Sequence, residues 1–306
     1  MPRQARIDAP GALHHILIRG IEQRGIFEDN KDREDFLERL SKLLQELVTP
    51  CYAWALMTNH VHLLLRTGTV PIASVMRQLL TGYAVRFNRR HRRSGHLFQN
   101  RYKSILCEED EYLKQLVAYI HLNPLRAGIV ADFAALKDYS FTGHSALMGK
   151  KDRPWQDTAY ILTLFGRTVS EAKRNLQRYV LKWSGKGRCL ELTGGGLVRS
   201  AGGWRAVKEA YRVGIQLAGD ERILGSSEFV ETTLKQAGEA YNRKTRLQSA
   251  GMNLSALIAA VCRYLKVDGK ELSGPTRRPE IARPAQWLAI LPLGSCRFQE
   301  ARWPVD

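Results

Sequence analysis

Residues 51–67, CYAWALMTNHVHLLLRT, carry the pattern that decides the fold. Two largely apolar runs, 51–57 and 60–67, flank Thr58 and Asn59, a polar pair suited to a tight turn. Short apolar runs with such boundaries are typical of β-strands. We therefore expect a β-hairpin at this point of the chain.

The segments around the hairpin alternate between strand and helix patterns. Large apolar side chains recur at helical spacing in the segment before the hairpin and in the segment after it. A further strand pattern lies on the far side of each of these helical segments. The expected elements are a strand at 11–20, a helix at 31–48, the hairpin, a helix at 70–93, a strand at 101–107 and a helix at 109–123. This order predicts an α+β, ferredoxin-like (RRM-like) domain, in which an antiparallel sheet carries helices on one face.

The second strand of the hairpin places two histidines on one side. Side chains alternate along a strand, so His60 and His62 share one face while their aliphatic neighbours share the other. The apolar face must meet the helices, which leaves the histidines on an open face. Their Cα atoms are about 6 to 7 Å apart, so both imidazoles are able to reach one cation, although they need further ligands to complete a site.

The chain is strongly basic. Its 306 residues hold 47 Lys and Arg against 30 Asp and Glu, a net charge of +17. Residues 47–107 contain nine Lys and Arg and no acidic residue. This surplus indicates a polyanionic partner, of which nucleic acid is the commonest, although a solvated basic face has the same composition.

Composition also indicates the compartment. No apolar run approaches the length of about 18 to 20 residues that spans a membrane, and the N-terminus lacks the apolar stretch of a secretory signal. The five cysteines are scattered and form no C-x-x-C pair, which argues against a disulfide framework or a cysteine zinc site. We expect a cytoplasmic protein with no membrane partner.

Composition shifts divide the chain into three parts. We predict a domain at 1–145, a connecting and partly helical segment at 146–200, and an all-α region at 201–306. Within the last part, residues 253–291 fit a helix-turn-helix with a basic entry into its second helix. A plain helical bundle has the same pattern.

Further motifs accompany the hairpin. They are HHILIRGIEQRGIF (14–27), MTNHVHLLL (57–65), GHLFQNRYKSIL (95–106) and AYIHLNPLRAGIV (118–130). The last motif places Tyr119 and Asn123 four residues apart, hence on one face of a helix. Over residues 5–145 the chain resembles the REP-associated tyrosine transposases, a branch of the single-tyrosine HUH nucleases.

The resemblance implies roles for four residues. His60 and His62 match the pair that holds a divalent cation, Asn123 matches a third ligand through its amide oxygen, and Tyr119 matches the nucleophile. Oxygen ligands suit Mg²⁺ and nitrogen ligands suit Mn²⁺, so either metal is a candidate. Tyr112, seven residues before Tyr119 on the same helix face, is the alternative nucleophile.

Basic residues in two regions are predicted to contact DNA. The first group surrounds the end of the second helix and comprises Arg86, Arg89, Arg90, Arg92, Arg93, Arg101 and Lys103. Phe98 and Tyr102 lie among them and suit either base stacking or core packing. Residues 265–291 resemble the C-terminal DNA-binding domain of the bacterial replication initiator DnaA, with Arg277, Arg278 and Arg283 at the recognition helix.

Charge and spacing predict a metal-dependent protein that acts on a polyanion. The resemblance implies a metal-dependent single-stranded DNA endonuclease and strand transferase, similar to a transposase, that nicks beside REP-like hairpins through a 5′-phosphotyrosine. Its C-terminal region would add contacts to duplex DNA. The alternatives are a non-catalytic, sequence-specific DNA-binding regulator derived from a transposase, and an RNA nuclease or RNA-binding protein on the same scaffold. The sequence does not distinguish a monomer from a homodimer.

Overall fold

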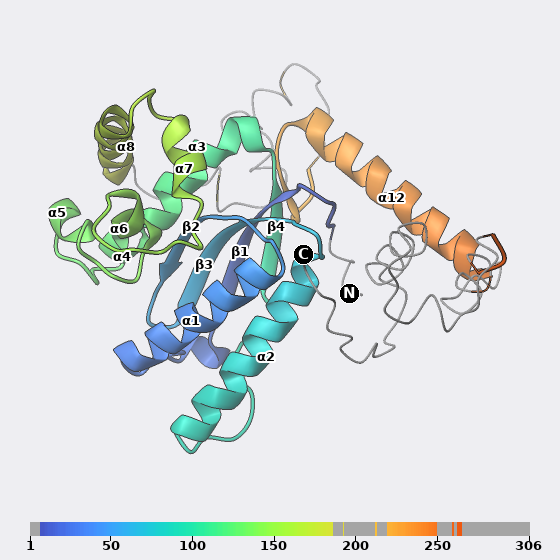
Figure 1. Ribbon diagram of the computed structural model, residues 1–306, viewed down its shortest axis with the longest axis horizontal. Coiled ribbons are helices and arrows are strands. Elements are labelled where there is room, and N and C mark those ends of the chain that lie inside the picture. The colour runs from blue at the N-terminus through green and yellow to red at the C-terminus, as the bar shows by residue number, and fades with distance from the viewer. Residues whose placement is uncertain are drawn as a thin grey trace. The chain divides into compact units, whose positions relative to one another are not determined.

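The computed structural model describes residues 7–185 and 219–249, together with Leu192, Arg212, Ala259 and residues 262–264. Figure 1 shows its elements, which are β1 (Leu13–Arg19), η1 (Ile21–Gln23), α1 (Asn30–Glu46), β2 (Cys51–Leu56), β3 (His60–Arg66), α2 (Ile72–Arg90), β4 (Lys103–Cys107), α3 (Glu109–His121), α4 (Asn123–Arg126), α5 (Phe133–Leu136), α6 (Gly143–Leu147), α7 (Thr158–Thr163), α8 (Val169–Ser184), β5 (Ile223–Leu224) and α12 (Ser227–Ser249). Each strand and helix predicted between residues 11 and 123 is present, with ends that differ by up to three residues.

The first four strands form an antiparallel sheet in the order β2-β3-β1-β4. The predicted turn closes the hairpin of β2 and β3, where the Met57 amide donates to the His60 carbonyl at 2.9 Å. β1 lies between β3 and β4 and places Leu17 opposite His62. This is the ferredoxin-like strand order, so the predicted α+β class is confirmed.

A fifth strand makes the sheet mixed rather than purely antiparallel. β5 runs parallel to β4, and the Leu106 amide donates to the Arg222 carbonyl at 2.7 Å. Both residues of β5 are buried. A strand of two residues is too short to show an alternating pattern, which is why the sequence does not predict it.

Two helices cover one face of the sheet, as predicted. α1 and α2 lie side by side on that face (Figure 1), and Val61, Leu63 and Leu65 of β3 are fully buried beneath them. Asp29 precedes α1 and caps it, because its carboxylate accepts a hydrogen bond from the Asp32 amide at 3.0 Å. This layer forms one of the two hydrophobic cores of the domain.

The opposite face is also covered, which corrects the expectation of an open face. α3 packs against β2 and β3, and α6, α7 and α8 extend this second layer (Figure 1). Leu64 is fully buried, and His62 is only 4% exposed. All six residues of β2 are buried, a pattern typical of strands with both faces covered. The histidines therefore lie in a partly enclosed site.

The chain forms two compact units, residues 1–233 and 234–306. All the side chains of the candidate site belong to the first unit. The boundaries at residues 145 and 200 stay a prediction from composition. In the part of the chain that the structure describes, no helix is both long and apolar enough to cross a membrane.

The predicted helix-turn-helix falls in the second unit. Within residues 253–291 the structure describes only Ala259 and residues 262–264. The predicted contacts Arg277, Arg278 and Arg283 lie outside the described residues. The resemblance of this region to DnaA therefore stays a prediction.

Candidate active site

A cavity of about 400 Å³ opens on the sheet face that α3 covers. Its lining comes from β1, β3, β4, α3 and α4, from the loop before β4 and from one residue after α8, and comprises His15, Leu17, Arg19, His60, His62, Gln99, Asn100, Arg101, Lys103, Ile105, Tyr119, Asn123 and Leu192. The cavity thus brings together all four residues for which the sequence predicts a role at a metal or as nucleophile, although they are spread from residue 60 to residue 123.

His60 and His62 point to the same side of β3, as strand alternation requires. Their rings meet edge to face with centroids 5.2 Å apart. Asn59 donates its amide nitrogen to the Gln23 carbonyl at 3.0 Å, so its oxygen faces Nδ1 of His60 at 2.7 Å. Because an amide oxygen only accepts, Nδ1 of His60 carries the proton and Nε2 keeps a lone pair.

Both histidines are neutral near pH 7. Burial and, to a smaller extent, the charge of Arg19 lower the pKa of His60 to about 4. Burial also lowers the pKa of His62 well below its ordinary value, and His15, His60 and Arg19 add to this effect. A neutral imidazole offers a lone pair to a metal, whereas a protonated one repels it. The electrostatics of the cavity therefore favour metal coordination.

Tyr119 lies half-buried on α3, with its ring edge-on to His62 and the two ring centroids 5.9 Å apart. Four residues later, Asn123 donates Nδ2 to the carbonyls of Tyr119 at 3.0 Å and Ile120 at 3.3 Å. Only the amide nitrogen is able to donate to these carbonyls, so the contact defines which side-chain atom is the oxygen. The guanidinium carbon of Arg126 lies 5.4 Å from the ring centroid of Tyr119.

The rival residues occupy different positions. Tyr112 is 7% exposed and packs in the core beneath α3, whereas Tyr119 lines the cavity. His121 is fully buried and faces the ring of His144 at a centroid distance of 5.7 Å. Tyr102 is partly buried against the core under α2, and its role in base stacking stays a prediction.

Several residues that line the cavity are not predicted from the sequence, among them His15 and Arg19. Both lie on β1, where Leu17 pairs with His62 and Arg19 pairs with His60. Side chains at alternate positions of β1 share a face, so the motif HHILIRG contained the necessary signal. This signal is usable only when the register of β1 against β3 is known. A slip of one residue would turn His15 and Arg19 to the other face of the sheet.

The donor set of the cavity fits a divalent cation that shares its coordination with a substrate. The protein offers two neutral imidazoles and one amide oxygen, from His60, His62 and Asn123. Among the described residues, no three His, Cys, Asp or Glu side chains come together as a metal site. Phosphate oxygens would complete the ligand set, and mixed nitrogen and oxygen ligation suits Mn²⁺ better than Mg²⁺.

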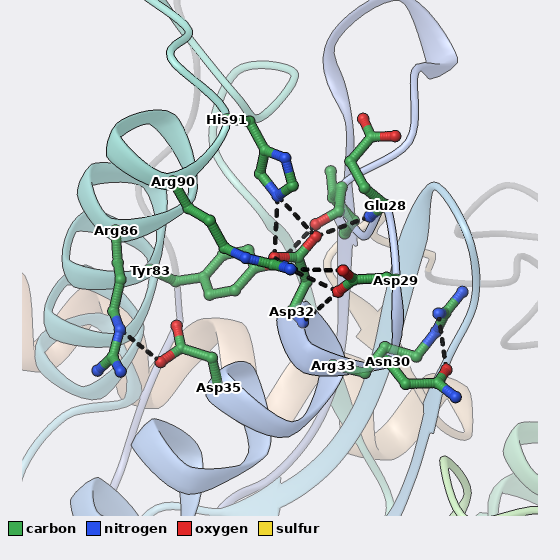
Figure 2. A network of polar contacts seen from close by, with 11 residues as sticks. Glu28, Asp29, Asn30, Asp32, Arg33, Asp35, Tyr83, Arg86, Arg90 and His91 are labelled. Atoms are coloured by element: carbon green, nitrogen blue, oxygen red, sulfur yellow. Dashed lines mark hydrogen bonds and ion pairs between the residues drawn. The ribbon is translucent and has the colours of Figure 1, made fainter.

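Two of the arginines predicted to contact DNA form ion pairs with α1 and its N-terminal cap (Figure 2). Nε of Arg86 lies 2.8 Å from Asp35, and Arg90 contacts both Asp29 and Asp32. Nε2 of His91 lies 3.0 Å from each carboxylate oxygen of Asp32. These contacts tie the end of α2 to the start of α1.

The contacts of Arg90 shift Asp29 and Asp32 toward the charged form. Arg90 lowers the pKa of Asp29 well below its ordinary value. Burial alone would raise the pKa of Asp32, but hydrogen bonds from His91, the Glu28 amide and Arg90 together lower it. The charge of Arg90 is therefore largely engaged within the protein.

The other predicted arginines have different surroundings. Arg89 and Arg92 are exposed, and the guanidinium carbon of Arg93 lies 5.6 Å from the ring centroid of Phe87. Arg101 and Lys103 are exposed and line the cavity beside the histidines. Of the seven residues predicted around the end of α2, these two share the cavity with the candidate catalytic side chains.

A model of a known protein family matches the N-terminal part of the chain. Residues 11–123 match the family model described as Transposase IS200 like. The match includes β1 to β4 and α3, and it ends at Asn123. No curated protein matches the chain.

Solved structures that match this chain include two transposases. One is a REP-associated tyrosine transposase bound to a REP hairpin, which is 14% identical, with a TM-score of 0.41 over 51% of this chain and 98% of the other. A second is a putative transposase from Deinococcus radiodurans, which is 18% identical, with a TM-score of 0.29 over 39% of this chain and 95% of the other.

Proposed function

We propose, from the match of residues 11–123 to IS200-like transposases, that this protein is a metal-dependent single-stranded DNA endonuclease and strand transferase. The observation that carries the proposal is the position of Tyr119, which shares one cavity with His60, His62 and Asn123. A nucleophile beside three candidate metal ligands is the arrangement that phosphodiester transesterification needs.

The proposed reaction exchanges one phosphoester for another. The phenol oxygen of Tyr119 loses its proton and attacks the scissile phosphorus, and an O–P bond forms to the tyrosine. The bond from phosphorus to the 3′ oxygen breaks, and that oxygen takes up a proton. The products are a 5′-phosphotyrosine and a free 3′-OH. Because the covalent link conserves the bond energy, a 3′-OH is able to reverse the step and join strands.

The residues of the cavity would position the phosphodiester. His60, His62 and Asn123 would hold a divalent cation. When bound, this cation would neutralise negative charge on the non-bridging phosphate oxygens. Arg101 and Lys103 at the rim would bind neighbouring phosphates. The contacts of the Tyr119 ring with His62 and Arg126 restrict the phenol to few orientations and so support an in-line attack.

The substrate class follows from the resemblance of the sequence motifs, which implies single-stranded DNA beside a REP-like hairpin. The net charge of +17 supports a polyanionic partner but does not distinguish DNA from RNA. The DnaA-like region would add contacts to duplex or hairpin DNA through Arg277, Arg278 and Arg283.

The test is covalent capture. Full-length protein is incubated with end-labelled single-stranded DNA that carries a REP-like hairpin, with Mn²⁺ or Mg²⁺, and the products are separated on denaturing gels. We expect a metal-dependent protein–DNA adduct that is lost in Tyr119→Phe and retained in Tyr112→Phe. Both variants remove only a hydroxyl, so Tyr112→Phe is a matched control on the same helix.

Other results would favour the alternatives. An adduct that persists in Tyr119→Phe and disappears in Tyr112→Phe would move the nucleophile to Tyr112. Cleavage of an RNA version of the oligonucleotide with no cleavage of the DNA would indicate an RNA nuclease. Tight DNA binding without an adduct or a nick would leave the non-catalytic regulator as the better account.

A further inference from the structure

We propose that His15 is a positioning residue that holds His62 in the orientation and tautomer in which Nε2 faces the cavity. The inference rests on the proposed function, because it concerns the same metal centre. It assigns a role to a third histidine, on a different strand from the predicted pair.

The contact between the two histidines is direct and buried. Nε2 of His15 lies 2.9 Å from Nδ1 of His62, and the two ring planes are nearly parallel, at 21°, with centroids 5.2 Å apart. His15 is 5% exposed and His62 is 4% exposed. In the sheet, Leu17 lies opposite His62, so His15 is a diagonal neighbour of His62 on the same face.

The hydrogen bond distinguishes the two ring nitrogens of His62. Because His15 engages Nδ1, Nε2 is the nitrogen of His62 that remains for a ligand in the cavity. A histidine that binds a metal through Nε2 carries its proton on Nδ1 and donates it to an acceptor, which orients the ring and raises its basicity. Nε2 of His15 is that acceptor, and the same nitrogen is therefore not itself a metal ligand.

The equivalent contact of His60 supports this assignment. Nδ1 of His60 faces the side-chain oxygen of Asn59 at 2.7 Å. Each histidine of the pair thus has an orienting partner at Nδ1, and both keep Nε2 for the cavity. One partner is an amide oxygen from the adjacent residue, and the other is an imidazole from β1.

The chain offers a matched control in the neighbouring residue. His14 is on the same strand and is 1% exposed, but alternation turns it to the other face of the sheet. There its Nε2 lies 3.2 Å from Asp8 and its Nδ1 lies 3.2 Å from Ser104. Substitution of His14 perturbs the same strand without altering the contact to His62.

The first experiment measures Mn²⁺ affinity of the full-length protein by isothermal titration calorimetry. We expect His15→Leu to weaken binding by about 10- to 100-fold, as loss of an orienting partner does at other metal centres. We expect His15→Gln, which keeps an acceptor near the position of Nε2, and the control His14→Gln to stay close to wild type. DNA cleavage by His15→Leu should recover at saturating Mn²⁺, because His15 acts through metal occupancy.

A second measurement needs no substitution. Long-range ¹H–¹⁵N spectra of the metal-free protein report which ring nitrogen of each histidine is protonated. The expected result is an Nδ1–H tautomer at His62 and at His60. An Nε2–H tautomer at His62 overturns the inference, whether or not the His15 variants fold.

The outcomes separate this inference from the proposed function. If wild type binds Mn²⁺, His62→Ala abolishes binding and His15→Leu binds as wild type does, the role of His15 is wrong and the metal centre stands. If wild type binds neither Mn²⁺ nor Mg²⁺, the proposed metal centre itself fails. A loss in His15→Gln as large as in His15→Leu would also overturn the inference, since an acceptor alone should suffice.

Discussion

Asn123 donates its side-chain amide to the backbone carbonyl of Tyr119 across a distance of 3.0 Å. The bond links the candidate third ligand to the candidate nucleophile and closes the end of α3. It also determines which atom of the amide is able to bind a metal. The nitrogen donates its hydrogen bond to the backbone, which leaves the oxygen as the ligand atom.

Substitutions of Asn123 should separate these two roles. Asn123→Ala removes the oxygen, so we expect Mn²⁺ affinity to fall by about tenfold or more. Asn123→Asp keeps an oxygen ligand but cannot donate to the Tyr119 carbonyl, so Mn²⁺ should bind while adduct formation slows. Calorimetry and single-turnover adduct assays measure the two effects.

A matched control for Asn123 is Asn175→Ala on α8. Asn175 also donates its amide to a backbone carbonyl, that of Phe165 at 2.7 Å, and it does not line the cavity. Unchanged Mn²⁺ affinity in Asn123→Ala would show that the amide oxygen is not a ligand.

Arg126 should influence the rate of the covalent step. Arg126 is exposed, and a cation over an aromatic ring at an exposed site contributes about 0.5 to 1 kcal/mol, so loss of this contact should slow adduct formation by about 2- to 5-fold. The expected result for Arg126→Met is this slower rate with unchanged Mn²⁺ affinity. Lys114→Met, on the same helix as Tyr119, removes a similar contact, to Phe165, and should leave the rate unchanged. A wild-type rate in Arg126→Met would contradict the role of Arg126 in positioning Tyr119.

The buried pair His121 and His144 should make stability depend on pH. Burial, and then the charge of Lys137, lower the pKa of His144 to about 4, and burial and His144 lower that of His121 well below its ordinary value. The unfolded chain binds these protons below about pH 6.5 whereas the folded protein does not, so stability falls as pH drops below that value. For His144 alone the loss between pH 7.5 and 5 is on the order of 2 kcal/mol.

Urea unfolding at pH 7.5 and pH 5 measures this dependence. His144→Leu should reduce the loss of stability between the two pH values. His96→Gln, at an exposed histidine, should leave it unchanged. An equal pH dependence in wild type and His144→Leu would show that His144 is not a source of acid sensitivity.

Salt dependence should distinguish the arginines that contact DNA from those engaged within the protein. Each phosphate contact to a single strand contributes about 0.7 to the slope of log affinity against log salt. Arg101→Gln should lower the slope by about that amount, whereas Arg86→Gln should change it less, because Arg86 pairs with Asp35. Fluorescence anisotropy with labelled hairpin DNA at increasing NaCl gives the slopes. Equal slopes for the two variants would refute this distinction.

The periodicity of the sequence determined the elements of the domain and part of its site. Alternation along 60–66 placed His60 and His62 on one face, and the spacing of four residues placed Tyr119 beside Asn123. These relationships are local, because they depend only on the repeat of a strand or a helix. The order of strands and helices then limited the fold to a ferredoxin-like sheet.

Only the tertiary structure decided which faces meet. It placed α3 against the histidine face, aligned His15 of β1 with His62, and paired Arg86 and Arg90 with acidic residues near the start of α1. It also covered a sheet face that the pattern of β3 left open. Such contacts join residues far apart in the chain, and they depend on register and on packing between layers. Local periodicity carries no information on either, so these features emerge only when the chain folds.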